Sequence, residues 1–281
     1  NMKIKKINKY IGAEVTGVNL NKPVSEEMKK ELYNALLDNV ALVIREQSFS
    51  AEEFMKAVSL FGELMEDQNR RYIAEGVPMV SILSNRHVDS AGKPAKIANN
   101  ATWHTDHTNQ EYPPKFTALY PVALPDTGGG TALCNMREAY SALSDDWKIK
   151  IDWMKTANTL ISSARAATGN LDIVREQKEA GTPPMIHPLV RTHPERGTRS
   201  IWFHKAKTEN IIGMESQETQ NFLAELLEEA IRPEFTYIHE YTLGDMLIID
   251  NRSSMHKAGF DYDHSQHRML YRALVRGDKP F

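Results

Sequence analysis

The sequence lacks the features that mark several common classes of protein. Its 281 residues contain one cysteine, so an intramolecular disulfide is impossible. No apolar run approaches the ~18 residues of a membrane-spanning helix, and no signal-peptide core opens the chain. Basic and acidic residues are intermixed at a formal net charge of -3, which leaves no basic stripe for a nucleic-acid backbone. We therefore expect a cytoplasmic protein that binds neither nucleic acid nor a membrane.

The sequence also lacks internal repeats, low-complexity tracts and linkers rich in Pro, Gly or Ser. A content of 41% hydrophobic and 25% charged residues is ordinary for a globular protein. All-β proteins of this length often form one domain. We therefore expect a single domain over residues 1–281.

The pattern of apolar residues predicts a mainly β protein with flanking helices. The first third should hold a helix over 25–38, a strand over 40–45, a helix that begins at a capping box of Ser50 and Glu53, and a strand over 79–83. Further helices are predicted over 136–153 and 216–232. Extended segments are expected over 116–120, 131–134, 185–191, 200–203, 235–241, 246–249 and 269–275. Strands of this number and length are typical of a β-barrel or jelly roll with helices outside it.

A His-x-Asp motif is the first candidate for a metal site. Residues i and i+2 of an extended strand point to the same side, so the motif offers an imidazole and a carboxylate to one metal. Two copies occur, His87 with Asp89 and His104 with Asp106. The first lies in a polar, turn-rich segment, whereas β-forming threonines flank the second, so we choose the second. A surface loop is the alternative, because the motif alone is a weak signal.

The third metal ligand should come from a distant strand. A 2-His-1-carboxylate triad on iron leaves positions open for a cosubstrate and O2. His256 follows the apolar segment 246–249 and a turn-prone stretch at 250–254, from which its ring can point into the mouth of a barrel. A structural or solvated role is expected for His187, His193, His239, His264 and His267.

Two arginines share one face of the predicted strand at the C-terminal end. Period-2 alternation places Arg268 and Arg272 beside Leu270 and Leu274. A cationic group on a largely apolar face is costly unless it binds an anion, and a guanidinium matches a carboxylate with two hydrogen bonds. A solvent-facing strand with two extended arginine side chains is the alternative interpretation.

Three glycines, at positions 128 to 130, precede Thr131. No Lys-Ser or Lys-Thr pair follows them, so a nucleotide-binding loop is not indicated. A turn that lets the backbone approach a ligand is favoured instead, with Thr131 as a hydroxyl donor to the anion bound by Arg268.

Taken together, these motifs resemble the taurine dioxygenase family of Fe(II)/2-oxoglutarate oxygenases. The likeness rests on Trp103-His104-Thr105-Asp106, Gly129-Gly130-Thr131, Asp250-Asn251-Arg252 ahead of His256, and the segment from His267 to Arg272. Segments 10–13, 61–64, 187–194 and 277–281 also look like that family, so the resemblance runs almost end to end.

This resemblance implies a double-stranded β-helix (jelly-roll) core and a set of site residues. The implied Fe(II) ligands are His104, Asp106 and His256. Thr131 and Arg268 would bind the distal carboxylate of 2-oxoglutarate, and Arg272 would lie near this cosubstrate and the acidic group of the substrate. Asn100 matches a substrate-contacting position. The implied reaction oxidises a C–H bond with O2 and converts 2-oxoglutarate to succinate and CO2.

The chain departs from the family pattern on the substrate side. Residues 65–72 contain no histidine, where the taurine enzyme carries one that contacts the sulfonate. His107 and Asn109 replace apolar residues after the metal motif, and Lys207 falls about where a phenylalanine is expected. We therefore expect His107, Lys207 and Arg272 to bind a small, polar, anionic organic acid, and taurine to be a weak substrate at best.

Other functions stay open. If the departures do not alter the substrate, the chain is a taurine dioxygenase or another sulfonate or sulfate-ester dioxygenase, and carboxylic acids, including aryloxy acids, are a further substrate class. A non-catalytic metal-binding jelly roll with a sensory role is the alternative from another class, and it needs no clamp of Arg268 and Thr131. Asp106 argues against halogenation, since related iron halogenases lack the carboxylate ligand. A homo-oligomer is expected.

Overall fold

The fold is described for residues 1–88, 91–94, 102–166 and 183–281 of a computed structural model. The strands are β1 (Lys3–Lys6), β2 (Ala13–Thr16), β3 (Ala41–Ile44), β4 (Leu64–Met65), β5 (Ile73–Ala74), β6 (Val77–Ser84), β7 (Phe116–Ala123), β8 (Thr131–Asn135), β9 (Lys155–Asn158), β10 (Met185–Pro188), β11 (Val190–Thr192), β12 (Arg199–Ile201), β13 (Thr208–Ile211), β14 (Thr236–His239), β15 (Met246–Asp250), β16 (Ser254–Ala258) and β17 (Met269–Val275). The helices are α1 (Glu26–Asn39), α2 (Ala51–Ser59), α3 (Met136–Ser141), α4 (Asp145–Ile151), α5 (Ser163–Ala166), α7 (Ser216–Ala230) and the 3-10 helix η2 (Pro233–Phe235).

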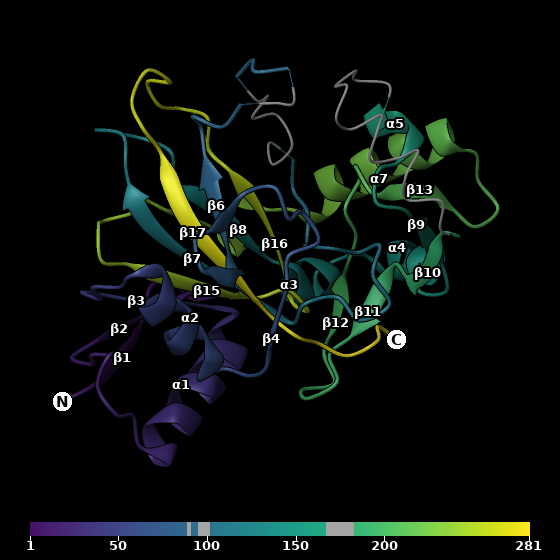
Figure 1. Ribbon diagram of the computed structural model, residues 1–281. Helices are drawn as coiled ribbons and strands as arrows, with labels where there is room; N and C mark the ends of the chain where they lie inside the picture. The colour runs from purple at the N-terminus through teal and green to yellow at the C-terminus, as the bar shows by residue number, and fades with distance from the viewer. Residues whose placement is uncertain (89–90, 95–101, 167–182) are drawn as a thin grey trace.

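Two sheets form the core (Figure 1). The main sheet has the order β1-β2-β3-β15-β7-β17-β6-β5, with β4 paired to β17, and the second has the order β14-β8-β16. Along the chain, β7 is followed by β8 in the other sheet, and β14, β15, β16 and β17 alternate between the two. This winding is that of a jelly roll, so the expected double-stranded β-helix is confirmed.

Helices α1 and α2 cover one face of the main sheet (Figure 1). In β15, Ile248 joins the cluster that contains Leu36 of α1 and Phe54 of α2, whereas Leu247 packs on the opposite face with Leu133 of β8. Because side chains alternate along a strand, β15 contributes residues to the core on both faces of the sheet. The capping box of Ser50 and Glu53 is present and begins α2.

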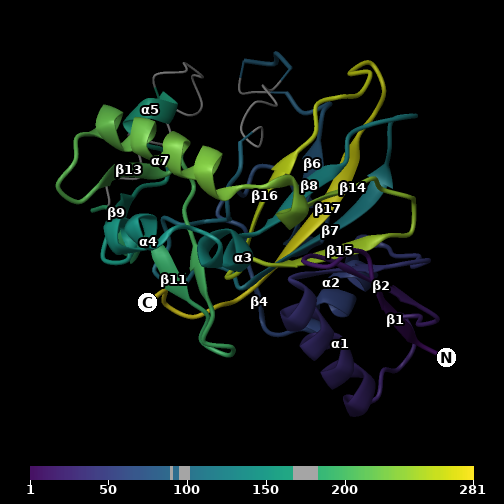
Figure 2. The same ribbon diagram turned by 180° about the vertical axis from the view of Figure 1, so that it is seen from behind.

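The helices of the second half pack outside the two sheets (Figure 2). The apolar face of α7, including Phe222, Leu223 and Leu226, is buried in a cluster with Ile201 and Ile211. The expectation that this helix lies outside the barrel is confirmed. None of the described helices has the length and apolar composition needed to span a bilayer.

Two of the expected elements are each divided in two in the structure. The helix expected over 136–153 is two helices, α3 and α4, because Ser144 caps a new helix by accepting a hydrogen bond from the backbone N–H of Trp147. The strand expected over 185–191 is divided between β10 and β11, since the backbone N–H of Leu189 turns to the carbonyl of Met154. Strand β17 has the bounds expected from the sequence.

Candidate active site

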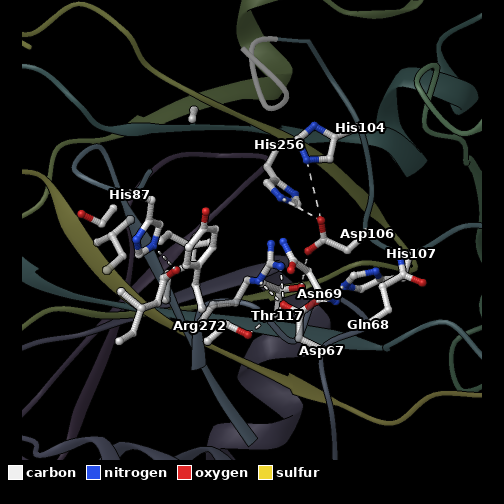
Figure 3. Close-up of a pocket in the computed structure, with 18 of the residues that line it drawn as sticks. Asp67, Gln68, Asn69, His87, His104, Asp106, His107, Thr117, His256 and Arg272 are labelled. Carbon is white, nitrogen blue, oxygen red and sulfur yellow. Dashed lines mark hydrogen bonds and ion pairs between the residues drawn. The ribbon is translucent and has the colours of Figure 1, made fainter. Parts of the chain in front are cut away.

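The three expected metal ligands converge in one buried group (Figure 3). His104, Asp106 and His256 are 2%, 5% and 7% exposed, and one ligand atom of each lies within 4.8 Å of the others. Oδ1 of Asp106 is 3.7 Å from Nε2 of His104 and 3.5 Å from Nε2 of His256. Two imidazoles and one carboxylate in this arrangement are the donor set of a facial iron site.

The backbone explains why residues far apart in the sequence meet. His104 and His256 exchange two backbone hydrogen bonds, of 2.8 and 3.1 Å, so the segment around His104 pairs with the edge of β16. The hydroxyl of Thr105 donates to the carbonyl of Asn251 at 3.1 Å. This extended segment places His104 and Asp106 on the same side, as the i, i+2 spacing predicts.

Hydrogen bonds orient two of these side chains. His104 donates from Nδ1 to the carbonyl of Thr102 at 2.7 Å, which leaves Nε2 for a metal. The hydroxyl of Thr117 donates to Oδ2 of Asp106 at 2.6 Å, which leaves Oδ1. Thr117 in turn accepts from Nδ2 of Asn251 at 2.8 Å. Each oriented side chain thus presents one ligand atom.

The local electrostatics keep these groups in the protonation states that bind metal. Burial and the nearby charge of His256 lower the pKa of His104 to about 3, so its imidazole is neutral at pH 7. Burial opposes ionisation of Asp106, but His256 and Arg272 hold the pKa of this carboxyl well below its usual range. A neutral imidazole and an ionised carboxylate are the forms that bind a metal ion.

Hydrogen bonds fix the Asp250-Asn251-Arg252 segment, which precedes β16 and contacts the metal-binding side chains' neighbours. Asp250 accepts hydrogen bonds from Arg252 and faces Nε2 of His193 at 2.9 Å, with all three side chains buried. Asn251 contacts Thr105 and Thr117, which belong to the metal side. The segment therefore fixes the turn before β16, and His193 has the structural role expected of it.

The triad opens on a cavity of about 660 Å³ that also contains Thr131 and Arg268. Nε of Arg268 donates to the carbonyl of Gly129 at 2.8 Å, and none of the described carboxylates pairs with the terminal nitrogens. Thr131 Oγ1 lies 2.7 Å from the hydroxyl of Tyr241. Gly129 has φ +75°, and a Cβ there would lie 3.1 Å from Nε of Arg268, so the glycine permits this close approach.

Arg272 lies against an acidic residue that the sequence did not single out. Its Nε donates to Oδ2 of Asp67 at 3.1 Å, and Nη2 contacts the same oxygen (Figure 3). Nε2 of His107 is 3.5 Å from Oδ1 of Asp67. Burial lowers the pKa of His107 to about 4 even though Asp67 raises it, so His107 is neutral at pH 7.

Lys207 and His204 line another part of the cavity. The ammonium of Lys207 donates to the carbonyl of Leu160 at 3.0 Å, and burial lowers its pKa to about 8. The ring of His204 lies 4.5 Å from that of His104, centroid to centroid, and its Nδ1 accepts from the backbone N–H of Ala206. We did not predict His204, because it lies at the end of an expected strand and its approach to His104 depends on the tertiary fold.

Two further positions complete the comparison with the sequence. Asn100 lies outside the described residues. His87 lines the cavity away from the triad, with its ring stacked on Tyr72 at 3.7 Å and its Nε2 3.0 Å from the carbonyl of Ile82 (Figure 3). Asp89, which follows His87 in the other His-x-Asp motif, also lies outside the described residues, so the choice of His104 and Asp106 stays a prediction, which the convergence of that pair with His256 supports.

Two facing sheets that carry a buried His-Asp-His group define the class of jelly-roll proteins with a mononuclear non-haem iron site. Within that class, the family model described as "Taurine catabolism dioxygenase TauD, TfdA family" matches residues 3–274. The chain belongs to this family. The family's reaction class is 2-oxoglutarate-dependent oxidation at a non-haem iron, so this expectation is confirmed.

Individual relatives cover nearly the whole chain. The 2,4-dichlorophenoxyacetate dioxygenase of Cupriavidus pinatubonensis is 30% identical over 283 residues, 97% of this chain and 96% of the relative. The sulfonate dioxygenase of Saccharomyces cerevisiae is 27% identical over 99% of this chain and 68% of the relative. The crystal structure of AAD-2 in complex with Mn(II) and N-oxalylglycine superposes with a TM-score of 0.82 at 29% identity, covering 100% of this chain and 99% of that one.

Proposed function

We propose that this protein oxidises a C–H bond of a small anionic organic acid, using Fe(II), O2 and 2-oxoglutarate, and that it forms succinate and CO2. One observation carries the proposal. The buried group of His104, Asp106 and His256 opens on the same cavity as Arg268 and Lys207, two cations without a carboxylate partner among the described residues. The cavity thus offers one metal site and two places for anions.

The triad would hold the iron, and the fit rests on its donor set and orientation. When bound, iron and 2-oxoglutarate together activate O2 for oxidation of a C–H bond. The protein's part is to hold His104 and Asp106 with one ligand atom each toward the metal, through Thr102 and Thr117.

Arg268 and Thr131 would bind the distal carboxylate of 2-oxoglutarate. The terminal nitrogens of Arg268 match a carboxylate in shape and charge. Because Gly129 holds Nε of Arg268 in place, the guanidinium is oriented before a ligand arrives. Tyr241 extends this site, because its hydroxyl contacts that of Thr131. A clamp of this kind has no use in a purely structural metal protein, which disfavours the sensory role.

The substrate's acidic group would lie at Lys207. The relatives named above act on 2,4-dichlorophenoxyacetate and on sulfonates, and a further relative from Sphingobium herbicidovorans acts on (S)-phenoxypropionate. These compounds share an anionic group, a carboxylate in two cases and a sulfonate in one. Lys207 and His107 favour a polar acid, while taurine or another sulfonate is the second candidate, supported by the family and by the yeast relative.

Succinate formation tests the proposal. Fe(II)-loaded protein with 2-oxoglutarate and O2 is assayed against carboxylates, aryloxy acids, sulfonates including taurine, and sulfate esters. We expect one group of acids to stimulate succinate formation, with taurine weak, and the oxidised product to identify the carbon attacked. The absence of Fe(II)-dependent succinate formation with every acid would contradict the proposal.

Two expectations about the whole chain are also retained as proposals. One domain over residues 1–281 is supported because β1 and β17, from the two ends of the chain, belong to the same sheet. A homo-oligomer is supported by Ile149 and Trp153, apolar side chains that are 73% and 91% exposed. Light scattering of the purified protein measures the oligomeric state, and a monomer at all concentrations would contradict the second proposal.

A further inference from the structure

Two of the cations that line the cavity, Arg272 and Lys207, differ in their partners. Arg272 makes two contacts with Oδ2 of Asp67, one from Nε at 3.1 Å and one from Nη2. Asp67 is 3% exposed, so this is a buried ion pair whose net charge is close to zero. An anion that approaches Arg272 also approaches the carboxylate of Asp67, and in a poorly screened site that repulsion offsets much of the attraction.

Several contacts hold Asp67 in this position. Ser81 of β6 and Arg272 of β17 are cross-strand neighbours, and both donate to Oδ2 of Asp67, Ser81 at 2.9 Å. The backbone N–H of Asn69 donates to Oδ1 at 3.1 Å.

The segment that carries Asp67 is fastened at a further point. The side-chain amides of Gln68 and Asn109 exchange two hydrogen bonds, of 3.0 and 3.1 Å, so this segment is tied to the one that follows the metal motif. The ion pair of Asp67 with Arg272 is therefore built into the fold.

Lys207 has no such partner. Its ammonium donates to the carbonyl of Leu160, which is neutral, and none of the described carboxylates lies within ion-pair distance. The side chain is partly buried, and burial lowers its pKa to about 8 although the charges of Asp106 and Asp67 raise it, so at pH 7 it is a cation without an ion-pair partner among the described residues. An ammonium without an ion-pair partner in a cavity is stabilised by a bound anion.

We propose that Asp67 is a specificity-determining residue, which withdraws Arg272 from the acidic group of the substrate and leaves Lys207 as its anchor. The inference rests on the proposed function for the identity of the site. It assigns the substrate a single acidic group recognised by an ammonium. It also explains the role of the residue that stands in the segment 65–72, where the family resemblance places a substrate contact.

Four variants separate the roles of these residues. Lys207→Met removes the anchor. Asp67→Asn keeps the size of the side chain but releases the charge of Arg272. The pair Asp67→Asn with Arg272→Met removes both charges and leaves neither partner unpaired, and Asp67→Asn with Lys207→Met tests whether the released Arg272 replaces the lysine. Glu66→Gln is the matched control, since Glu66 is the neighbouring carboxylate, exposed and 3.7 Å from Arg70.

The measurement is calorimetric titration of protein loaded with Mn(II) and N-oxalylglycine, in which no turnover occurs. The probes are 2,4-dichlorophenoxyacetate, ethanesulfonate and ethyl sulfate. We expect at least one probe to bind the wild type, and Lys207→Met to weaken that binding by about thirtyfold or more, the loss typical of truncating one partner of a buried charge pair. The pair Asp67→Asn with Arg272→Met should stay within about threefold of wild type, because removal of a whole ion pair is often nearly neutral.

The decisive result is the combination of Asp67→Asn with Lys207→Met. It should bind the probe at least about threefold more tightly than Lys207→Met alone, because Arg272 regains an unpaired charge. A purely structural role of Asp67 gives no recovery. The inference is overturned if recovery is absent, if loss of the Asp67 and Arg272 charges weakens binding as much as Lys207→Met does, or if no probe binds the wild type.

Two controls keep these outcomes interpretable. Thermal unfolding and binding of N-oxalylglycine show whether each variant is folded. Probe binding by the single variant Asp67→Asn is compared with that of the two double variants that contain the same change. Fe(II)-dependent succinate formation by the wild type is measured separately. Its absence would contradict the proposed function, whereas the titrations address Asp67, Arg272 and Lys207.

Discussion

Arg268, which directly precedes β17, and Arg272, in the middle of that strand, lie four residues apart and both line the cavity, yet their surroundings differ. Arg268 donates to the backbone carbonyl of Gly129, whereas Arg272 is paired with the carboxylate of Asp67. The strand period predicts that both enter the cavity, and both do. What each arginine does there depends on the segments opposite, which come from elsewhere in the sequence.

Substitution of the metal ligands should have the largest effect of the changes considered, because 2-oxoglutarate and the substrate bind beside the metal. Replacing His104, Asp106 or His256 by alanine should weaken Mn(II) binding by more than about a hundredfold, the upper figure for loss of an outer-shell group. His87→Ala is the control and should bind normally, since the contacts of His87 are to Tyr72 and Ile82. Metal affinities measured by competition with a chelator check this, and a loss confined to His87→Ala would show that the wrong pair was chosen.

The arginines themselves should give opposite phenotypes. Arg268→Ala leaves the distal carboxylate of 2-oxoglutarate unpaired, so cosubstrate affinity should fall by at least about a hundredfold with little change in stability. Arg272→Ala leaves Asp67 buried without its partner and should lower the free energy of unfolding by about 3 kcal/mol. Calorimetry and denaturant unfolding of both variants measure the difference, and identical phenotypes would remove the distinction between the two arginines.

A smaller effect is expected at Thr117, which acts on the metal through Asp106. Thr117→Val removes the hydrogen bond to Oδ2 of Asp106 and should weaken Mn(II) binding by about tenfold, the lower range for a group that orients a ligand. Thr117→Ser keeps the hydroxyl and should restore the affinity. If the serine variant binds metal as weakly as the valine variant, packing and not the hydrogen bond is responsible.

The smallest effect is a pH dependence on the substrate side. Burial lowers the pKa of Lys207 to about 8, so its side chain is a charged ammonium at neutral pH. The positive charge is lost as the pH rises through that value. The kcat/KM for an anionic substrate should therefore be constant below pH 8 and fall above it, by at most about tenfold per pH unit. Lys207→Met should lack this fall, and an unchanged profile in that variant would assign the titration to another group.

The sequence predicts those features that depend on local pattern. Backbone periodicity predicts that His104 and Asp106 point to the same side, and it predicts strand β17, which bears Arg272 and directly follows Arg268. The spacing of Ser50 and Glu53 predicts the capping box. The local pattern did not predict the end of α3, because the apolar pattern continues past Ser144, which caps the next helix.

Local sequence patterns do not predict which residues contact the site residues. Asp67 meets Arg272 across 205 positions of sequence, and Asn251 meets Thr117 across 134. These contacts depend on how the sheets pair, and a single aspartate in a loop has no pattern that marks it. His204 and Tyr241 were missed for the same reason, since their neighbours in the cavity are set by the winding of the two sheets.

A crystal structure of the protein with Mn(II) and N-oxalylglycine, an analogue of 2-oxoglutarate with NH in place of a methylene, tests the central claim most directly. We predict the metal on Nε2 of His104, Oδ1 of Asp106 and Nε2 of His256, and the distal carboxylate of the analogue on Arg268 and Thr131, with Arg272 still paired to Asp67. A metal bound elsewhere, or a distal carboxylate held by Arg272, would contradict the account.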